Sequence, residues 1–309
     1  MPSTRVASSS ENESRGITLF DALPPRASRH TIAVSDVDLG YSLIEPTGPV
    51  RGTAVLVAGY TSSYDTFNVL LEPLAENGYR VIGLSQRGQP HSTGPDTVDG
   101  YSLAQLGSDI HTFIDALSEK LGDLGHIHLL GHSFGGVVAH EAVAQNPRRF
   151  ASVTLWNSGP RDFGEGGPAH DALVADGPRG LWVLDRQRMG LDPDIDLAGD
   201  MSVIERYYFD RLMTTKPAAL LAGAAILRDQ IDRTNELATL SREHGIPFLI
   251  SHGAQDDAWP ADWQRDMAIA LGADYVVLAN AGHSSHGDRP NMAADVLATF
   301  WSDATTSTS

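Results

Sequence analysis

The 309-residue chain carries 22 Lys and Arg against 39 Asp and Glu, a formal net charge of −17, which repels phosphate backbones and anionic lipid surfaces. We therefore expect neither nucleic acid nor a membrane as a partner. Because cysteine is absent, disulfides and thiolate metal ligands are excluded, and with no apolar leader-like run at the start the expected location is cytoplasmic.

The two ends of the chain differ in composition from its centre. Residues 1–29 are rich in Ser, Glu and Arg and are predicted to be a flexible tail, as are the Ser- and Thr-rich residues 303–309. Between them, short apolar runs bounded by turn residues alternate with amphipathic stretches, which is typical of βαβ units. The predicted fold class is α/β, with a mainly parallel central sheet flanked by helices.

The expected strands and helices follow one another along the chain. Residues 30–46 predict two antiparallel strands. Six further strands are predicted at 52–59, 79–85, 126–131, 151–157, 247–253 and 274–280. Apolar residues at helical spacing predict three core-facing helices, at Phe67, Leu70, Leu71 and Leu74, at Leu103, Leu106, Ile110, Phe113 and Leu117, and at Met292, Val296 and Phe300.

The alternation is interrupted once, in residues 161–245. Here 202–213 and 217–231 both have helical patterns with no strand between them. We predict an inserted helical cap over 161–245, and a core formed by 30–160 and 246–302. Large apolar side chains in the cap either pack against each other or line a pocket, and helical spacing favours packing; they are Trp182, Met201, Tyr207, Tyr208 and Met213.

A serine lies between two glycines where a predicted strand gives way to a helix, in the segment "HLLGHSFGG". Gly131, Ser133 and Gly135 form a G-x-S-x-G pattern. A serine on such a sharp turn projects its hydroxyl above the sheet, and the glycines remove side chains that would collide there. The segment matches neither a Walker A loop nor G-x-G-x-x-G. Ser133 is therefore the candidate nucleophile.

A serine hydroxyl needs a histidine base and an acid that orients it. Both residue types follow downstream, each just beyond a predicted strand, where ligands bind in open α/β sheets. The acid is Asp256 or Asp257, and the base is His283. His283, His286 and Asp288 also suggest a metal site, but the two histidines lack helical i, i+4 spacing, so no metal is predicted.

With these motifs, the chain resembles the capped members of the α/β-hydrolase fold family over residues 30–302. The family places its acid in G-x-x-D-x-x-x-P, matched by Gly253, Asp256 and Pro260, and its histidine in G-H-x-x-x-x-[DE]-x-P, matched by Gly282, His283, Asp288 and Pro290. The resemblance thus implies the triad Ser133, Asp256 and His283. It also implies that the backbone amides of Tyr60 and Phe134 form an oxyanion hole. In relatives a histidine usually precedes the glycine at position 59, whereas this chain has Ala58.

A second departure lies in "SQRGQPHS", where relatives have D-x-R-G-x-G-x-S. Arg87, Gly88 and Ser92 match, whereas Ser85 and Pro90 do not. We expect Arg87 to have a structural role, because buried ion pairs of arginine are commoner than substrate contacts. A serine nucleophile and the absence of His-Gly-x-Pro argue against epoxide hydrolases and dehalogenases, in which a carboxylate attacks carbon.

The function predicted from the sequence is cofactor-free hydrolysis of a carboxylic ester, thioester or lactone of a small-molecule acyl substrate. The same triad in relatives also performs C–C bond hydrolysis, amide hydrolysis and metal-free perhydrolysis, which remain alternatives. A ligand-binding protein with little turnover is the alternative from another functional class.

Overall fold

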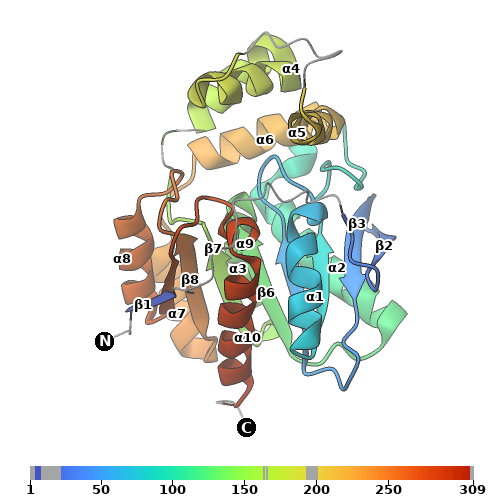
Figure 1. Ribbon diagram of the computed structural model, residues 1–309, viewed down its shortest axis with the longest axis vertical. Helices are drawn as coiled ribbons and strands as arrows, with labels where there is room; N and C mark the ends of the chain where they lie inside the picture. Colours follow the sequence, from blue (N-terminus) through green and yellow to red (C-terminus); the bar gives the residue numbers. More distant parts are fainter. Residues whose placement is uncertain (1–3, 8–21, 163, 165, 193–200, 307–309) are drawn as a thin grey trace.

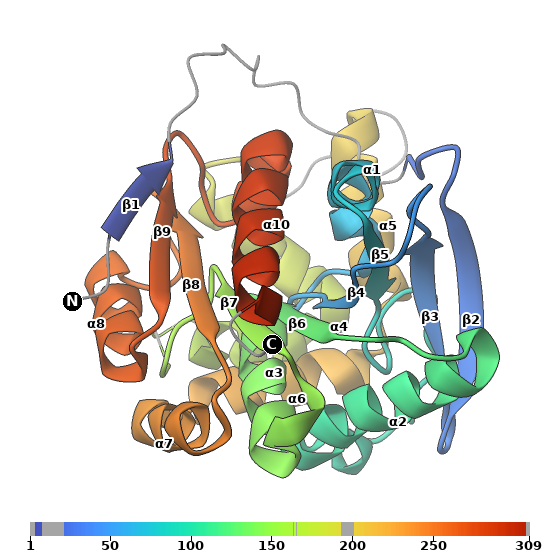
Figure 2. The ribbon, with the colours of Figure 1, turned by 90° about the horizontal axis from the view of Figure 1, so that it is seen from below.

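The computed structural model describes residues 4–7, 22–162, 164, 166–192 and 201–306. These residues form a nine-stranded sheet with the strand order β1-β9-β8-β7-β6-β4-β5-β3-β2 (Figures 1 and 2). The strands are Thr4–Ala7 (β1), Ser28–Val34 (β2), Val37–Ile44 (β3), Gly52–Val57 (β4), Tyr79–Leu84 (β5), Ile127–His132 (β6), Ser152–Trp156 (β7), Phe248–Gly253 (β8) and Asp274–Leu278 (β9).

The predicted sheet is confirmed. β2 and β3 form the expected antiparallel hairpin, β3 pairs antiparallel with β5, and the other neighbouring strands are parallel. Every residue of β4, β5, β7 and β8 is buried, as expected for strands that helices cover on both faces. The alternation of side chains in β4 shows this directly, since Val55 and Val57 join one apolar core, and Ala54 and Leu56 join the other.

Helices cover both faces of the sheet. On one face lie α1 and α10, which include the predicted apolar positions near residues 70 and 296. On the other lie α2, α3, α7 and α8. These helices span Asn68–Glu76 (α1), Leu103–Leu121 (α2), Phe134–Gln145 (α3), Thr234–His244 (α7), Ala261–Leu271 (α8) and Pro290–Thr306 (α10). Short helical turns lie at Tyr64–Phe67 (η1), Val98–Tyr101 (η2), Pro147–Arg149 (η3) and Ser285–Asp288 (α9).

The ends of the chain differ from the predicted tails. Thr4–Ala7 form β1, which pairs parallel with β9 at one edge of the sheet, and β2 begins at Ser28. A four-residue edge strand has too short an apolar pattern to be recognised in a sequence. Residues 1–3 and 8–21 of the predicted tail lie outside the described residues. At the other end, α10 continues to Thr306, and 307–309 lie outside the described residues.

A layer of helices lies beyond one end of the sheet (Figure 1). They are Gly166–Arg188 (α4), Val203–Thr214 (α5) and Pro217–Arg228 (α6). The sequence predicts α5 and α6 correctly but not α4, which contains Pro178 and, at Asp176 and Gly177, a break in helical geometry. The cap has its own apolar cluster, which includes Leu173, Leu181, Trp182, Leu212, Leu220 and Ala224.

The predicted cap boundary at residue 245 differs from the structure. α7 lies within 161–245, but Leu237 and Ala238 are buried in the main core beside α3 and α8. α7 therefore covers the sheet, and the cap helices end with α6 at Arg228. The sequence places α7 in the cap only because no strand separates it from α6. Within the described ranges, no helix combines the length and apolar composition needed to cross a bilayer.

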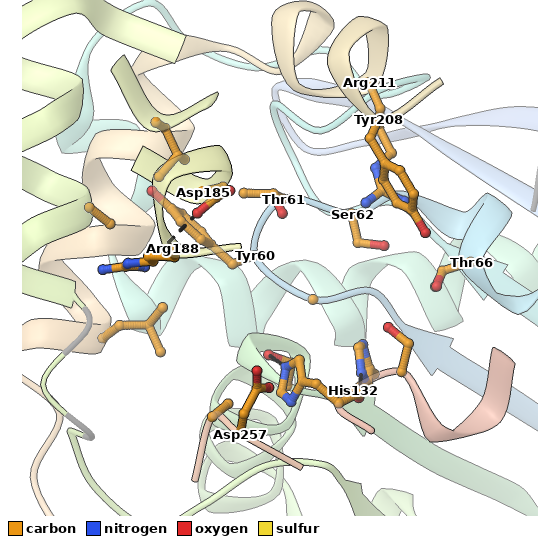
Figure 3. Close-up of a pocket in the computed structure, with 18 of the residues that line it drawn as sticks. Tyr60, Thr61, Ser62, Thr66, His132, Asp185, Arg188, Tyr208, Arg211 and Asp257 are labelled. Carbon is orange, nitrogen blue, oxygen red and sulfur yellow. Dashed lines mark hydrogen bonds and ion pairs between the residues drawn. The ribbon is translucent and has the colours of Figure 1, made fainter. Parts of the chain in front are cut away.

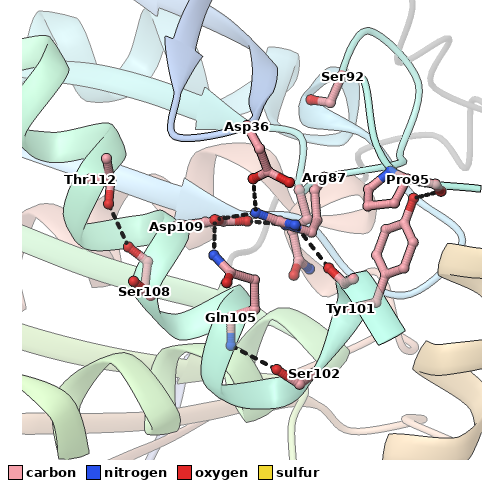
Figure 4. Close-up of polar contacts among 12 residues, drawn as sticks. Asp36, Arg87, Ser92, Pro95, Tyr101, Ser102, Gln105, Ser108, Asp109 and Thr112 are labelled. Atoms are coloured by element: carbon pink, nitrogen blue, oxygen red, sulfur yellow. Dashed lines mark hydrogen bonds and ion pairs between the residues drawn. The ribbon is translucent and has the colours of Figure 1, made fainter. Parts of the chain in front are cut away.

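Arg87 follows β5 and ties three parts of the core together (Figure 4). Its guanidinium makes a bidentate contact with Asp109 of α2, at 2.5 and 2.7 Å, and a 3.1 Å contact with Asp36 in the β2–β3 turn. It also donates to the carbonyl of Gly100, at 2.8 Å. The Arg87 side chain is 1% exposed. The predicted structural role is confirmed, and loss of one partner from such a buried pair costs about 3 to 5 kcal/mol.

Candidate active site

The turn between β6 and α3 holds Ser133 in a strained conformation. Its φ of 55° and ψ of −123° lie outside the regions that residues with a side chain readily adopt, at a cost of about 1 to 3 kcal/mol. A Cβ at Gly131 would lie 2.2 Å from the carbonyl oxygen of Gly135, and one at Gly135 would lie 2.2 Å from that of Val57. Both glycines are therefore required by close packing, as the sequence pattern predicts.

The loops after β8 and β9 bring an acid and a histidine to Ser133. His283 Nε2 lies 2.9 Å from Ser133 Oγ, and His283 Nδ1 lies 2.8 Å from Asp256 Oδ1. An ionised carboxylate only accepts hydrogen bonds, so Nδ1 carries the proton and Nε2 is free to accept one from the serine. Asp257, the other acid considered, is exposed and lines the pocket next to the site. The structure thus brings Asp256, rather than Asp257, to the imidazole.

Asp256 is held as a carboxylate by several donors. Asn157 Nδ2 donates to its Oδ2 at 2.9 Å, and the amide of Ala258 donates to its Oδ1 at 3.1 Å. Burial alone raises the pKa of Asp256, but the hydrogen bond and charge of His283, together with these donors, outweigh burial and lower the pKa to about 2. The carboxylate therefore stays ionised at neutral pH, where it can fix the orientation and tautomer of His283.

Asn157 is a site residue that the sequence does not reveal. It follows β7 with a φ of 50°, a region that Asn tolerates better than most residues. Besides Asp256, its amide also contacts the carbonyl of Gly282, at 3.1 Å, and its oxygen accepts from Ser285 Oγ at 2.5 Å. Asn157 thus connects the acid loop to the histidine loop. Its only signal in the sequence is its place directly after a strand.

Two further histidines lie beside His283. His132 Nε2–H donates to the backbone carbonyl of His283, at 3.0 Å, and His286 Nε2 lies 3.0 Å from Thr66 Oγ1. Burial lowers the pKa of His132 well below its ordinary value and lowers that of His286 to about 3, so both are neutral. In the part of the chain that the structure describes, no three His, Cys, Asp or Glu side chains are grouped to hold a metal ion.

The loop after β4 lies against the nucleophile turn. A Cβ at Gly59 would lie 3.2 Å from Ser133 Cβ, which shows how closely the two loops approach. Two buried glutamines hold the carbonyls of this loop: Gln86 Nε2 donates to Ala58 O at 2.7 Å, and Gln89 Nε2 donates to Gly59 O at 2.6 Å. Because the carbonyl and the next N–H of a trans peptide point in opposite directions, the Gln89 contact fixes the direction of the Tyr60 N–H.

The orientation of Gln89 is itself fixed, since its Oε1 accepts from the backbone N–H of Gln86 at 2.8 Å. Gln86 and Gln89 are 6% and 4% exposed. Both belong to "SQRGQPHS", the segment in which the chain departs from the D-x-R-G-x-G-x-S pattern. Sequence reasoning misses them because their contacts are with a loop about 30 residues away. The amide of Phe134, the other predicted donor, is at the first residue of α3, directly after Ser133.

A cavity of about 420 Å³ opens between these loops and the cap (Figure 3). Ser133, His283 and Trp259 line it on the core side. Ala169, Leu181 and Leu227 contribute apolar surface near the cap, and the polar cap residues at the cavity are Asp185, Arg188, Tyr208 and Arg211. Among the five large cap residues considered from the sequence, Tyr208 lines this cavity, whereas Trp182, Met201 and Met213 pack within the cap and Tyr207 packs edge-on against Tyr208.

The chain is similar to several known proteins. Over 245 residues, the chain is 27% identical to the dihydrolipoyllysine-residue acetyltransferase component of the acetoin cleaving system of Cupriavidus necator, covering 77% of this chain but only 60% of that component. It is 24% identical to 3-oxoadipate enol-lactonase 1 of Acinetobacter baylyi, covering 88% of this chain and 97% of the relative.

A solved structure has the same fold. The enol-lactonase from Burkholderia xenovorans LB400 superimposes with a TM-score of 0.71 at 23% identity, over 88% of this chain and 100% of that chain. The family model described as serine aminopeptidase, S33, matches residues 48–290, which is most of the sequence. The chain therefore belongs to this family of α/β-hydrolases.

Proposed function

We propose that the protein hydrolyses a carboxylic ester, thioester or lactone of a small-molecule acyl substrate, with Ser133 as the nucleophile. The observation that carries the proposal is the hydrogen-bonded series from Ser133 Oγ through His283 to Asp256, with separations of 2.9 and 2.8 Å, at the floor of a 420 Å³ cavity. A nucleophile, a base and a group that orients the base are the elements of acyl transfer by serine.

In the proposed reaction, Ser133 Oγ attacks the carbonyl carbon while His283 Nε2 takes its proton. The tetrahedral intermediate collapses, the bond to the leaving group breaks, and His283 returns the proton to the leaving oxygen or sulfur. Water then attacks the acyl-enzyme, giving its proton to His283, and the acid leaves as Ser133 regains its proton. Asp256 remains ionised throughout and stabilises the imidazolium.

The negative oxygen of each intermediate needs preorganised donors. The backbone amides of Tyr60 and Phe134 are the proposed pair. Gln89 is a positioning residue for the first of them, because its hydrogen bond to Gly59 O directs the Tyr60 N–H away from itself. This arrangement supplies what the missing histidine at position 58 supplies in relatives, the orientation of the loop.

The relatives support ester-like substrates. The A. baylyi relative, which matches nearly along its whole length, is an enol-lactonase by name, and a lactone is a cyclic ester. The acetyltransferase component of C. necator is matched over only part of its length, so its full activity carries less weight for this chain.

The test of the proposed function is a steady-state assay with acyl substrates of increasing chain length, as esters, thioesters and lactones, beside amides and C–C bond substrates. Ester, thioester or lactone turnover well above that of a Ser133→Ala variant is expected. Exclusive turnover of amide or C–C substrates would reassign the reaction. Tight binding without turnover of any of them would instead favour a ligand-binding protein.

The proposal also predicts the pH dependence. Protonated His283 cannot accept the serine proton. The logarithm of kcat/KM should therefore rise with pH with a slope of 1, the limb expected when one proton is lost. Asp256, with its pKa lowered to about 2, and His286, with its pKa lowered to about 3, keep their charge states above pH 4 and add nothing to this limb. A His286→Asn variant should keep the limb where it is. A slope of two protons, or a shifted limb in that variant, would contradict the assignment.

The Gln89 contact gives a further prediction. In Gln89→Glu, a carboxylate of nearly the same shape cannot donate to Gly59 O, so the loop should lose its orientation. We expect kcat to fall by about 10- to 100-fold with little change in KM, somewhat less than the loss of an oxyanion donor itself. Affinity for a trifluoromethyl ketone inhibitor should fall in parallel. Gln145→Glu, the same change on α3 far from the loop, is the control. Unchanged kcat in Gln89→Glu would remove the positioning role.

A further inference from the structure

We propose that Arg211 forms an anion-binding subsite in the cavity, which selects substrates that carry a carboxylate besides the scissile carbonyl. This inference rests on the proposed function and specifies its substrate class. Arg211 belongs to α5 of the cap and lines the same cavity as Ser133 and His283. An anionic group bound at Arg211 would therefore belong to the same substrate molecule whose carbonyl carbon reaches Ser133.

In the part of the chain that the structure describes, the guanidinium of Arg211 has no acidic partner. Among the described residues, no carboxylate lies within 4.0 Å of it. This contrasts with Arg87, Arg186 and Arg233, which each contact a carboxylate, and with Arg188 in the same cavity, which has Asp185 at 3.9 Å. In a chain with 39 acidic and 22 basic residues, a guanidinium that lines a cavity without pairing with a carboxylate is unexpected. An anionic ligand bound in the cavity would explain it.

Two tyrosines hold this guanidinium in place. Its central carbon lies 4.8 Å from the ring centre of Tyr208 and 5.4 Å from that of Tyr207. Cation–π attraction holds the positive guanidinium beside both rings. Within the described part of the chain, the buried Nε has no hydrogen-bond partner. A planar, prepositioned fork of donors matches a carboxylate, which it binds through two parallel hydrogen bonds.

Arg211 and Asp257 lie on different sides of the cavity. In the view of Figure 3, Arg211 and Tyr208 are on the same side of the cavity as the hydroxyl-bearing residues Ser62 and Thr66, and Asp257 is on the opposite side. A substrate carboxylate at Arg211 is thus placed away from this negative charge. The ligand chemistry is a carboxylate on either part of the ester, the acyl group or the alcohol, and matched substrates distinguish the two.

Two substrate pairs test the subsite. Mono-4-nitrophenyl glutarate and its methyl ester differ only in a free acyl-side carboxylate, and 4-acetoxybenzoate and its methyl ester differ only in an alcohol-side carboxylate. We expect wild-type protein to prefer the charged member of one pair by about 10-fold or more in kcat/KM, as a charge-assisted contact provides. In Arg211→Gln, the ratio of kcat/KM between the charged and the neutral member should fall to about 1, and Arg211→Lys should retain part of the preference.

Arg228→Gln is the matched control, because Arg228 is a cap arginine outside the cavity that pairs with Asp229. It should keep the wild-type preference. No preference for a charged substrate in either pair, or equal losses on both members in Arg211→Gln, would overturn the subsite and leave Arg211 a packing residue. The second result would follow if its stacking on the tyrosines were its whole role.

Binding of glutarate separates this inference from the proposed function. Calorimetric titration of the Ser133→Ala variant with glutarate should show salt-dependent binding, which Ser133→Ala/Arg211→Gln lacks. This result is independent of turnover, so it holds even if no ester is hydrolysed. Equal glutarate affinity in the two proteins would overturn the subsite, whereas absent ester turnover with Arg211-dependent binding would overturn only the proposed hydrolysis.

Discussion

Replacing Ser133 with alanine is expected to lower kcat on ester substrates by a factor of about 10³ or more, because the hydroxyl forms the covalent bond to the acyl group. The protein should stay folded, since within the described residues this hydroxyl has one side-chain hydrogen bond, that to His283. Steady-state kinetics and the melting temperature of the variant check both statements. A variant that retains most of the esterase activity would contradict the assignment of the nucleophile.

The effects on kcat of replacing His283 and Ser133 should not be additive. His283→Ala should reduce kcat by a similar factor, and the double variant should be little worse than either single one, because each removes the same step. His286→Asn should do much less, as its ring contacts Thr66 rather than Ser133. Equal losses at the two histidines would assign His286 a share in the chemistry that its position does not predict.

The adjacent acids should differ strongly. Asp256→Asn should lower kcat by about 10² to 10⁴, because an amide nitrogen in place of Oδ1 no longer accepts from Nδ1 and the histidine tautomer is lost. Asp257→Asn should cost far less in rate. It should also leave stability nearly unchanged, since α8 begins at Ala261 after Pro260 and Asp257 does not cap it.

Kinetics and melting temperatures of both variants decide between the two acids. A collapse of the rate in Asp257→Asn, with near-normal turnover in Asp256→Asn, would place the acid one residue later than the structure does. Stability at low pH gives a second check, because the lowered pKa of Asp256 means that its contribution to the free energy of unfolding is present above about pH 4 and is lost as pH falls toward 2.

The fold is predictable from the sequence where its signal is local. The eight strands from β2 to β9 have continuous apolar or alternating patterns, so their positions follow from periodicity. β1 is different, because four residues at a sheet edge depend on β9 for their structure. α4 is hidden by Pro178 and Gly177, and α7 is assigned to the wrong layer since the sequence does not say which surface an amphipathic helix covers.

In the candidate site too, the sequence predicts only the residues that belong to local motifs. Ser133, Asp256 and His283 each follow a strand within a recognisable motif, so the sequence places them at one edge of the sheet. Asn157 and Gln89 have no motif, and their importance comes from contacts that form only when distant loops meet. Arg211 is likewise one of several cap arginines until the fold places it in the cavity, where no carboxylate of the described residues forms an ion pair with it.

The most direct test of Ser133 as an activated nucleophile is the rate at which a fluorophosphonate labels the protein, followed by mass spectrometry of the digested protein. The reagent reacts with an activated serine whatever the natural substrate is. We expect one adduct, on the peptide that contains Ser133, with labelling slower by about 10² or more in His283→Ala and unchanged in Asp257→Asn. An adduct on another residue, or equal labelling rates in wild type and His283→Ala, would contradict an activated Ser133.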